Sequence, residues 1–510
     1  MTREARADAQ RDPFSSARDT FESIVESLRD TATRTQADTE RGVMEQSTEL
    51  IRQLLQARLN LLFQRERTHF AGTRREPGVE IRARARQLEA SVGRLIVRRF
   101  GIKGPSDGAA RFPMDEQLNL PPDLYTYPLR ERVADQAARS AYDQAVQQID
   151  ERTGGHVPKR QAEQLVVRAA RDFEAFYGQR PRPANDTLSD RALLMMSSDS
   201  TGITMRPEAL REATRKAAEE AATDAVKGDP MAAKPARRHD KRMAIVTAVW
   251  EQEPYKRTAK DIVDKLRPDA AAAAGKKPGK RKKAKRPPPP RPVDKRVWAS
   301  AEKSEANGIA EMFDEADRRD PRRCRTAVAL VDGDESQETA IYREARRHDR
   351  NLILVLDIIH VLHYLWQAGF ALNDKDPHET EAWVVRFLTK LLTLPVENVI
   401  ADIQRSLAQH KLSAKKRKPV DKCLKYFERH KTMMDYPAFL ALGLPIATGV
   451  IEGACRHLVQ DRLGITGARW GLQGAEAVLK LRAIRSSADW LDYWHFHEQQ
   501  EAQRNYARAA

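Results

Sequence analysis

The stretch TAVALVDGD, residues 326–334, ends an apolar run abruptly at an aspartate and a glycine. The run Ala327 to Val331 has the length of a buried strand. Three further runs of this kind lie at Ala192 to Met196, Met243 to Trp250 and Leu352 to Leu356, with helical patterns between and after them. Short strands that alternate with helices predict a mixed α/β core.

The N-terminal part of the chain is dominated by helical patterns. Up to about residue 66, apolar residues recur at helical spacing, which indicates a core face or a seam for a partner helix. The residues of this stripe are Val43, Ser47, Leu50, Ile51, Leu54, Leu55, Leu59 and Leu62. A short β-rich piece is expected around Ser91 to Phe100, before the chain turns helical again.

Between Tyr127 and Tyr177 the pattern indicates two helices separated by TGGHVP. The two glycines of this turn can end the first helix, and its proline suits the first turn of the second. Lys159 and Arg160 then stand at a helix start, where side chains can meet phosphates or bases. We interpret this segment as a candidate helix-turn-helix; an ordinary helical hairpin with a basic end is the alternative.

The charge of the chain is unevenly distributed. The formal net charge is +16, but Lys276 to Arg296 carries eleven Lys or Arg and one Asp, so that the other 489 residues hold only +6. The Lys- and Pro-rich composition of 268–296 is typical of a solvated linker that touches DNA without sequence specificity. The residues expected to make this contact are Lys280, Arg281, Lys282 and Lys283.

The length of 510 residues predicts several domains. Three cysteines without a C-x-x-C pair, Cys324, Cys423 and Cys455, are interpreted as buried free thiols. We predict a multidomain α+β chain with these segments: a disordered start (1–20), a helical and small β region (21–126), the helix-turn-helix-like region (127–185), the first part of the core (186–360), a helical insertion (361–445), and final core helices with a C-terminal tail (446–510).

Three carboxylates stand where strands or turns end. Asp199 follows RALLMMSS, Asp332 follows TAVALV, and Glu452 lies in the apolar segment PIATGVIEGACRHLV. An acidic residue in such surroundings is costly to bury without a partner, and a metal ion is one partner that offsets the cost. Carboxylates from separate elements suit Mg²⁺ and phosphodiester chemistry. From spacing alone, turn or helix caps are the alternative.

A second polar cluster lies in LILVLDIIHVLHYLW, where Asp357 and His360 share one face of a beginning helix. These two side chains could orient a substrate phosphate or act behind metal ligands. A structural Asp–His pair at a strand-to-helix junction is the alternative interpretation.

Five segments taken together identify a family resemblance. They are HVPKRQAEQLVVRAARDFEAFY, SSDSTGITM, VALVDGDESQ, LVLDIIHVLHYLW and ATGVIEGACRHLVQDRLGITGARWGLQGAEAVLKLRA. In this order, from about residue 90 to residue 495, the chain resembles ISKra-type bacterial insertion-sequence transposases, which are DDE transposases. The resemblance implies a ribonuclease-H-like α/β catalytic core that is interrupted by an all-helical insertion.

The resemblance also implies roles for individual residues. Asp199 is expected to end the first core strand, Asp332 the fourth, and Glu452 to lie on the helix that returns to the site, so that the three hold Mg²⁺, which Mn²⁺ can replace. Asp357 and His360 match a D-x-x-H motif near the site of related transposases.

Other alignments make Asp357 the second catalytic aspartate, or let Asp334 compete with Asp332. We favour Asp332, because it follows its strand at once and Gly333 lets the backbone approach a ligand. Trp470 could stack on an unpaired base or anchor a turn in the core.

The expected function is DNA transposition. The protein would bind the terminal inverted repeats of a mobile element, cleave DNA with a metal-activated water and join 3′ hydroxyl ends to target DNA, as a homodimer or higher oligomer with the N-terminal helices as candidates for the contact. The sequence has no apolar run that predicts a membrane helix, and we expect a cytoplasmic, nucleoid-associated protein. The alternatives are a nuclease without strand transfer and a catalytically silent or domesticated DNA-binding protein derived from a transposase.

Overall fold

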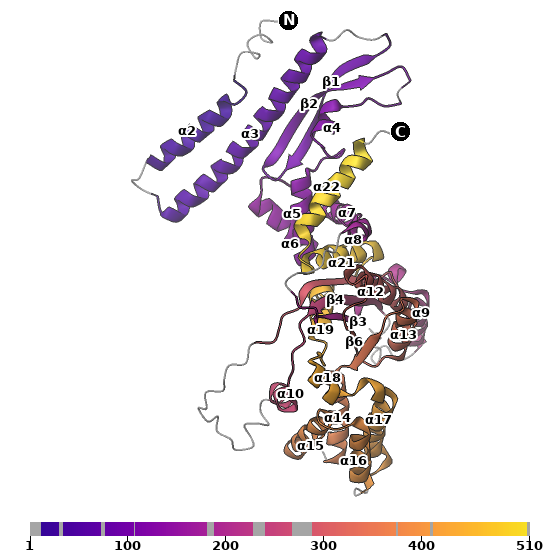
Figure 1. Ribbon diagram of the computed structural model, residues 1–510. Helices are drawn as coiled ribbons and strands as arrows, with labels where there is room; N and C mark the ends of the chain where they lie inside the picture. Colours follow the sequence, from indigo (N-terminus) through magenta and orange to yellow (C-terminus); the bar gives the residue numbers. More distant parts are fainter. Residues whose placement is uncertain are drawn as a thin grey trace. The chain divides into compact units, whose positions relative to one another are not determined.

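A computed structural model describes most of the chain. The described residues are 12–29, 34–72, 77–106, 108–180, 188–227, 240–267, 288–373, 376–408 and 412–506. They divide into two compact units, of which the first combines residues 1–180 with 489–510 and the second spans residues 181–488 (Figure 1). This confirms the multidomain organisation with both helices and strands.

The first unit is mainly helical. Its elements are α2 (Ser15–Arg29), α3 (Gln36–Gly72), β1 (Glu80–Ala90), β2 (Gly93–Lys103), α4 (Pro113–Gln117), α5 (Tyr127–Arg139), α6 (Tyr142–Arg152), α7 (Lys159–Ala169), α8 (Phe173–Gln179) and α22 (Trp490–Tyr506). The two strands form an antiparallel hairpin in which Ala90 pairs with Gly93, so that the expected β-rich piece is longer and begins before Ser91. Helix α3 packs along β2.

Helices α5, α6 and α7 pack around one small core that includes Leu129, Ile149 and Leu165. The turn between α6 and α7 lies against the β1–β2 hairpin, because a Cβ on Gly155 would come within 2.5 Å of the Ala90 carbonyl oxygen. Glycine is therefore required at this turn because the backbone of the hairpin approaches too closely for a side chain, in addition to its role in ending the helix.

The end of the chain departs from the sequence prediction. The sequence predicts that the segment 446–510 forms the final helices of the core and a C-terminal tail. Instead, α21 (Leu472–Ser486) belongs to the second unit and α22 to the first, and Ala488 between them has a φ of 60°. A left-handed residue interrupts a helix, which explains the division.

The second unit contains a five-stranded mixed sheet. Its strands are β3 (Leu193–Thr204), β4 (Lys241–Gln252), β5 (Val293–Ser300), β6 (Ala327–Val331) and β7 (Leu352–Leu356), in the spatial order β5-β4-β3-β6-β7. The first three pair antiparallel, while β6 is parallel to both β3 and β7. Every residue of β6 is buried, as expected for a strand with neighbours on both sides and both faces covered.

Helices cover this sheet and extend beyond it. They are α9 (Glu212–Lys227), α10 (Ala259–Leu266), α12 (Glu305–Arg319), α13 (Glu335–Arg347), α14 (Ile358–Leu372), α15 (Pro377–Leu391), α16 (Val396–Ala408), α17 (Ala414–His430), α18 (Tyr436–Leu442), α19 (Gly449–Ala454), α20 (Asp461–Leu463) and α21. Helix α12 packs on β3 and β4, and α21 on β5. Helices α14 to α18 form the expected helical segment, in which α14 packs against α15 and α17. Within the described residues, no helix combines the length and the apolar character that a bilayer crossing requires.

Candidate active site

Three aspartates line up at the carboxyl ends of neighbouring parallel strands. Ser197 of β3 pairs with Leu330 of β6, and Val331 pairs with Leu356 of β7. Continuing both registers along the chain brings Asp199, Asp332 and Asp357 into one row. Ligands of open α/β sheets bind at this edge, and the row is therefore the candidate active site.

Asp199 lies within β3, because the strand continues to Thr204 in its antiparallel pairing with β4. The expectation that Asp199 ends the first core strand is therefore wrong. Only the parallel pairing of β3 with β6 stops before Asp199, at Ser197. Its carboxylate accepts hydrogen bonds from the Ser200 backbone N–H at 2.6 Å and from the Cys455 thiol at 3.4 Å. Burial raises the pKa of Asp199, and the charge of Asp332 adds to this effect.

Asp332 follows β6 directly, as predicted, and is half-buried. Its Oδ1 accepts a hydrogen bond from the Asp334 backbone N–H at 3.0 Å. The hydroxyl of Tyr426 on α17 donates to the Asp332 carbonyl oxygen at 2.7 Å, which attaches the helical segment to this loop. Gly333 has a φ of 89°, and a Cβ there would lie 2.8 Å from the Tyr426 hydroxyl. Glycine is needed here for the approach of Tyr426.

Asp334 has a different role from Asp332. It is the N-cap of α13, and its side chain accepts from the backbone N–H groups of Ser336 and Gln337. The hydrogen bond from the Ser336 side chain lowers the pKa of Asp334, and these two N–H groups add to the effect. An exposed helix cap is a sufficient explanation for this aspartate, which favours Asp332 as the reactive member of the pair.

Asp357 is fully buried and its oxygens are already engaged. Oδ1 accepts from the Ile359 backbone N–H at 2.8 Å, and Oδ2 accepts from the hydroxyl and, at 3.4 Å, from the backbone N–H of Thr448. Asp357 therefore caps α14 and holds the residue that precedes α19. This arrangement suits a positioning residue better than a metal ligand.

His360 lies one helical turn beyond Asp357, with its side chain half-exposed. Its Nδ1 is 3.8 Å from Oδ2 of Asp357. The contact with Asp357 raises the pKa of His360, and the charges of Asp332 and Asp199 raise it further. When it is protonated, an imidazole beside three aspartates can neutralise part of their charge or contact a phosphate oxygen.

Glu452 lies on α19 and is exposed. Cys455, three residues further on, connects this part of the chain to the strand edge, because its thiol donates to Asp199. Burial raises the pKa of the Cys455 thiol, and the charges of Asp199 and Glu452 act in the same direction. The neutral thiol remains a donor, so that this helix is held against β3.

The helix that carries Glu452 changes form after Ala454. Residues Cys455–Gln460 form a π-helix, a rare geometry that occurs frequently at functional sites. The guanidinium of Arg482 on α21 donates hydrogen bonds to the carbonyl oxygens of His457 and Leu458 in this π-helix.

The predicted triad of Asp199, Asp332 and Glu452 is not drawn together in one tight group. Among the described residues, the group of three whose ligand atoms all lie within 4.8 Å of one another is Asp172, His497 and Glu501 in the first unit. Asp199 and Asp332 share the strand edge, and Glu452 is joined to that edge through Cys455.

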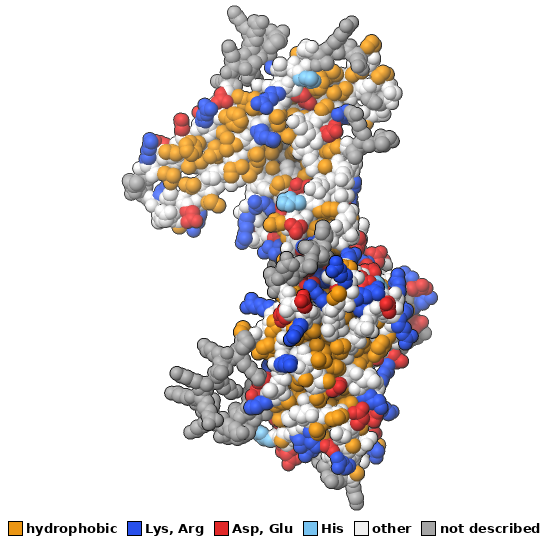
Figure 2. Space-filling view, viewed as in Figure 1, with side chains coloured by type: hydrophobic (Ala, Val, Ile, Leu, Met, Phe, Trp, Pro, Cys, Tyr) orange, Lys and Arg blue, Asp and Glu red, His pale blue; other side chains and the backbone are white. Residues whose placement is uncertain are grey.

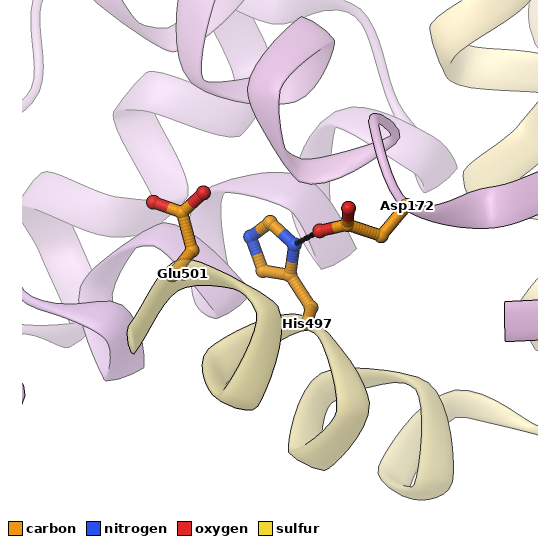
Figure 3. Close-up of side chains that lie close together, drawn as sticks. All are labelled: Asp172, His497 and Glu501. Carbon is orange, nitrogen blue, oxygen red and sulfur yellow. Dashed lines mark hydrogen bonds and ion pairs between the residues drawn. The ribbon is translucent and has the colours of Figure 1, made fainter. Parts of the chain in front are cut away.

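The Asp172 cluster is better explained as an ion-pair network. Figure 3 shows the His497 ring beside Asp172, with a hydrogen bond of 2.6 Å, and Glu501 on the same helix as the histidine. Arg504 donates to both oxygens of Asp172 at 2.6 and 2.7 Å and to Glu501 at 2.6 Å. A guanidinium that already engages both carboxylates leaves little reason for a metal cation, and the network instead fastens α22 to the segment between α7 and α8.

Trp470 has the surroundings of a core anchor, the second of the two alternatives that the sequence left open. Its side chain is buried, its indole N–H donates to the Leu463 carbonyl oxygen, and the Arg462 guanidinium lies 4.8 Å from the ring centroid. Its backbone bridges to Met205 beyond the end of β3. A base cannot reach a ring that is covered in this way.

Cations proposed for DNA contact fall in two places. Lys159 and Arg160 begin α7 and are exposed, and the Lys159 ammonium pairs with Asp143 at 2.8 Å. The four linker cations, Lys280, Arg281, Lys282 and Lys283, lie outside the described residues. Of the three cysteines, Cys324 is exposed, which corrects the expectation that all three are buried.

Two residues that organise the site have little signal in the sequence. Thr448 precedes α19 without any motif of its own, and Tyr426 lies 94 residues after Asp332 in a helix that reads as ordinary packing. Both act through hydrogen bonds to residues distant in the chain, which a local pattern cannot reveal.

Comparison with known proteins adds no assignment. No protein-family model matches the chain, and no curated protein is significantly similar to it.

Proposed function

We propose that this protein is a DNA transposase of insertion-sequence type, with Asp199, Asp332 and Glu452 as its catalytic carboxylates. The observation that carries the proposal is the register between β3 and β6, which aligns Asp199 with Asp332 at the carboxyl edge of the sheet. These strands are the first and fourth of the sheet in chain order, as the family resemblance requires. The strand order β5-β4-β3-β6-β7 supports a ribonuclease-H-like core.

The donor set fits a divalent cation of the Mg²⁺ type. Asp199 and Asp332 offer hard carboxylate oxygens. Burial raises the pKa of Asp199 and the charge of Asp332 adds to this effect, and a cation between the two carboxylates would offset both. When bound, Mg²⁺ or Mn²⁺ supplies activation of the attacking oxygen and stabilisation of the leaving oxygen.

The other residues of the site have supporting roles in this proposal. His360, with its raised pKa, is available to hold a phosphate oxygen of the DNA next to the aspartate row. Asp357 and Thr448 keep α14 and α19 in place, and Tyr426 holds the loop after β6. Glu452 completes the carboxylate set from the helical side, at a helix whose distance from Asp199 is fixed by Cys455.

Recognition of the element ends is assigned to the first unit. Helices α6 and α7 with the glycine turn between them have the form of a helix-turn-helix, and the exposed Arg160 at the start of α7 is free to meet a DNA phosphate or a base. Cleavage by water at the carboxylate site yields a 3′ hydroxyl, and attack of that hydroxyl on target DNA joins the two strands.

A cleavage and joining assay tests the proposal. Labelled DNA from the flanks of the gene is incubated with Mg²⁺ or Mn²⁺ and with wild type, Asp332→Asn, Asp357→Asn or Asp334→Asn, of which the last is a matched control for the loss of one acidic charge. We expect joined products that disappear in Asp332→Asn, fall in Asp357→Asn and persist in Asp334→Asn.

Other outcomes contradict the proposal. Cutting without joining would indicate a nuclease, and binding without cutting would indicate a silent DNA-binding protein. Metal-dependent cutting that survives Asp332→Asn would remove this aspartate from the site.

A further inference from the structure

The long hairpin of α2 and α3 leaves one face uncovered. On one side, α3 packs on the β1–β2 hairpin, where Phe63 stacks on Phe100 with centroids 5.3 Å apart. On the other side it packs on α2, where Thr20 donates to Gln53 at 2.8 Å and Ala57 is buried. Gln53 and Phe63 stand about 80° apart around the helix axis, so these contacts use one side of α3 and leave a third face on the opposite side.

The third face of α3 is apolar and exposed. Met44 is 68% exposed and Ile51 46%, and Leu54 beside them is 41% exposed. On α2, Phe21 and Leu28 are likewise exposed and seven residues apart. Figure 2 shows hydrophobic side chains gathered over the α2–α3 hairpin in this view. A contiguous patch of this kind marks an interaction surface.

Side chains on this face of α3 recur every seven positions, and all of them except the partly buried Ser47 are exposed. One row contains Met44, Ile51 and Arg58, and a second contains Glu40, Ser47 and Leu54. Two rows at heptad spacing form the seam of a coiled coil, where each side chain fits between side chains of a facing helix. The apolar seam is short, because Glu40 closes it at one end and Arg58 at the other.

We propose that this face binds the same face of a second copy of the chain, with the two α3 helices antiparallel. A two-fold axis makes position i meet position 98 − i of the partner, so that Met44 lies opposite Leu54 and Ser47 opposite Ile51. The same register sets Glu40 opposite Arg58 twice, once at each end of the seam. Both residues are exposed, and no ion pair is recorded for either within the described part of the chain.

The charges at the two ends of the α3 seam favour a second copy of the chain as the binding partner. An apolar seam closed by an acidic residue at one end and a basic residue at the other is complementary to its own reverse, which a second copy supplies. The helix is long enough for this contact, since 37 residues span about 55 Å. The inference concerns assembly and does not depend on the proposed transposase activity.

Sedimentation velocity of the full chain without DNA, over a concentration series, tests the proposal. We expect a monomer–dimer equilibrium that Ile51→Glu weakens by about 100-fold or more, because each copy would then bury a charge in the seam, opposite Ser47 and close to the axis. Leu491→Glu is the matched control, since this leucine is 69% exposed on α22, away from the seam, and the equilibrium should not change.

Charge exchange tests the register itself. Glu40→Arg and Arg58→Glu should each weaken the dimer by about tenfold, and the double variant should regain it. All three substitutions lie on exposed positions, and far-ultraviolet circular dichroism checks that the helices persist. A wild type that remains monomeric, an Ile51→Glu variant that still dimerises, or a double variant no better than the single ones would overturn the proposal.

Discussion

The hydroxyl of Thr448 donates a hydrogen bond to Oδ2 of Asp357, and this contact joins two helices that begin at the candidate active site. Asp357 is the N-cap of α14, and Thr448 is the N-cap residue of α19, the helix of Glu452. Asp357 is fully buried, and its carboxyl oxygens accept their hydrogen bonds from Ile359 and Thr448. The position of Glu452 is therefore tied to the end of β7.

Thr448→Val should lower both stability and activity. The substitution keeps the volume but removes a hydrogen bond to a buried carboxylate, which is worth about 1.5 to 3 kcal/mol. We expect a loss of this size in the free energy of unfolding and a strong reduction in strand joining. Thr448→Ser, which keeps the hydroxyl, is the control and should retain most of both. Equal behaviour of the valine and serine variants would argue against a role for the hydroxyl.

The aspartates at the strand edge could be predicted from the sequence for a physical reason. A strand buried on both faces is a continuous apolar run, so that Asp332 stands out where β6 ends. Asp199 is visible in the same way, but the end of β3 is not. The strand continues to Thr204 because it pairs with β4 as far as Lys241. This pairing joins residues distant in the chain, so a local sequence pattern cannot predict it.

The remaining errors have the same origin in contacts between distant residues. The sequence around Trp470 is compatible with a stacking surface and with a core residue. Its contacts with the Arg462 guanidinium and the Leu463 carbonyl oxygen favour the core. The return of α22 to the first unit depends on contacts such as that of the Tyr493 hydroxyl with the Ala169 carbonyl oxygen at 2.5 Å, across 324 residues.

Gly333→Ala should destabilise the loop after β6. A Cβ at a φ of 89° is strained, and it would lie 2.8 Å from the Tyr426 hydroxyl. We expect a loss of about 1 to 3 kcal/mol in the free energy of unfolding, measured by urea titration. Adding Tyr426→Phe removes the crowded oxygen and should recover part of this loss. No recovery in the double variant would show that backbone strain alone accounts for the effect.

Arg160→Ala should weaken binding to element-end DNA without affecting the fold. The side chain is exposed at the start of α7, so that its removal costs few internal contacts. If it neutralises one phosphate, the slope of log K against log salt concentration should become shallower by about one unit. Glu163→Ala on the same helix serves as a control. An unchanged slope would place the DNA contact elsewhere.

The Asp172 network should make the first unit sensitive to acid. Burial opposes ionisation of Asp172, but hydrogen bonds from His497 and Arg504 outweigh it and lower its pKa to about 2. A lowered pKa in the folded state stabilises the fold above the unfolded value near 4. Its contribution of about 2 kcal/mol is then lost as the pH falls from 4 to 2.

Asp172→Asn provides the comparison. Urea unfolding followed by tryptophan fluorescence, to which Trp490 and Trp494 contribute from the first unit, should give a clear difference between wild type and variant at neutral pH, and that difference should shrink below pH 4. A difference that stays constant down to pH 2 would contradict the ion-pair interpretation.

Iron-directed cleavage of the protein chain tests the central claim most directly. Fe²⁺ takes the place of Mg²⁺ at carboxylate sites, and with ascorbate and peroxide it cuts the backbone next to the bound ion. We predict cuts near Asp199, Asp332 and Glu452 that excess Mg²⁺ suppresses and that Asp332→Asn abolishes, while Asp334→Asn leaves them unchanged. Cuts near Asp172 and His497 instead, or cuts near Asp332 that Mg²⁺ does not suppress, would contradict a metal-dependent active site at the edge of β3 and β6.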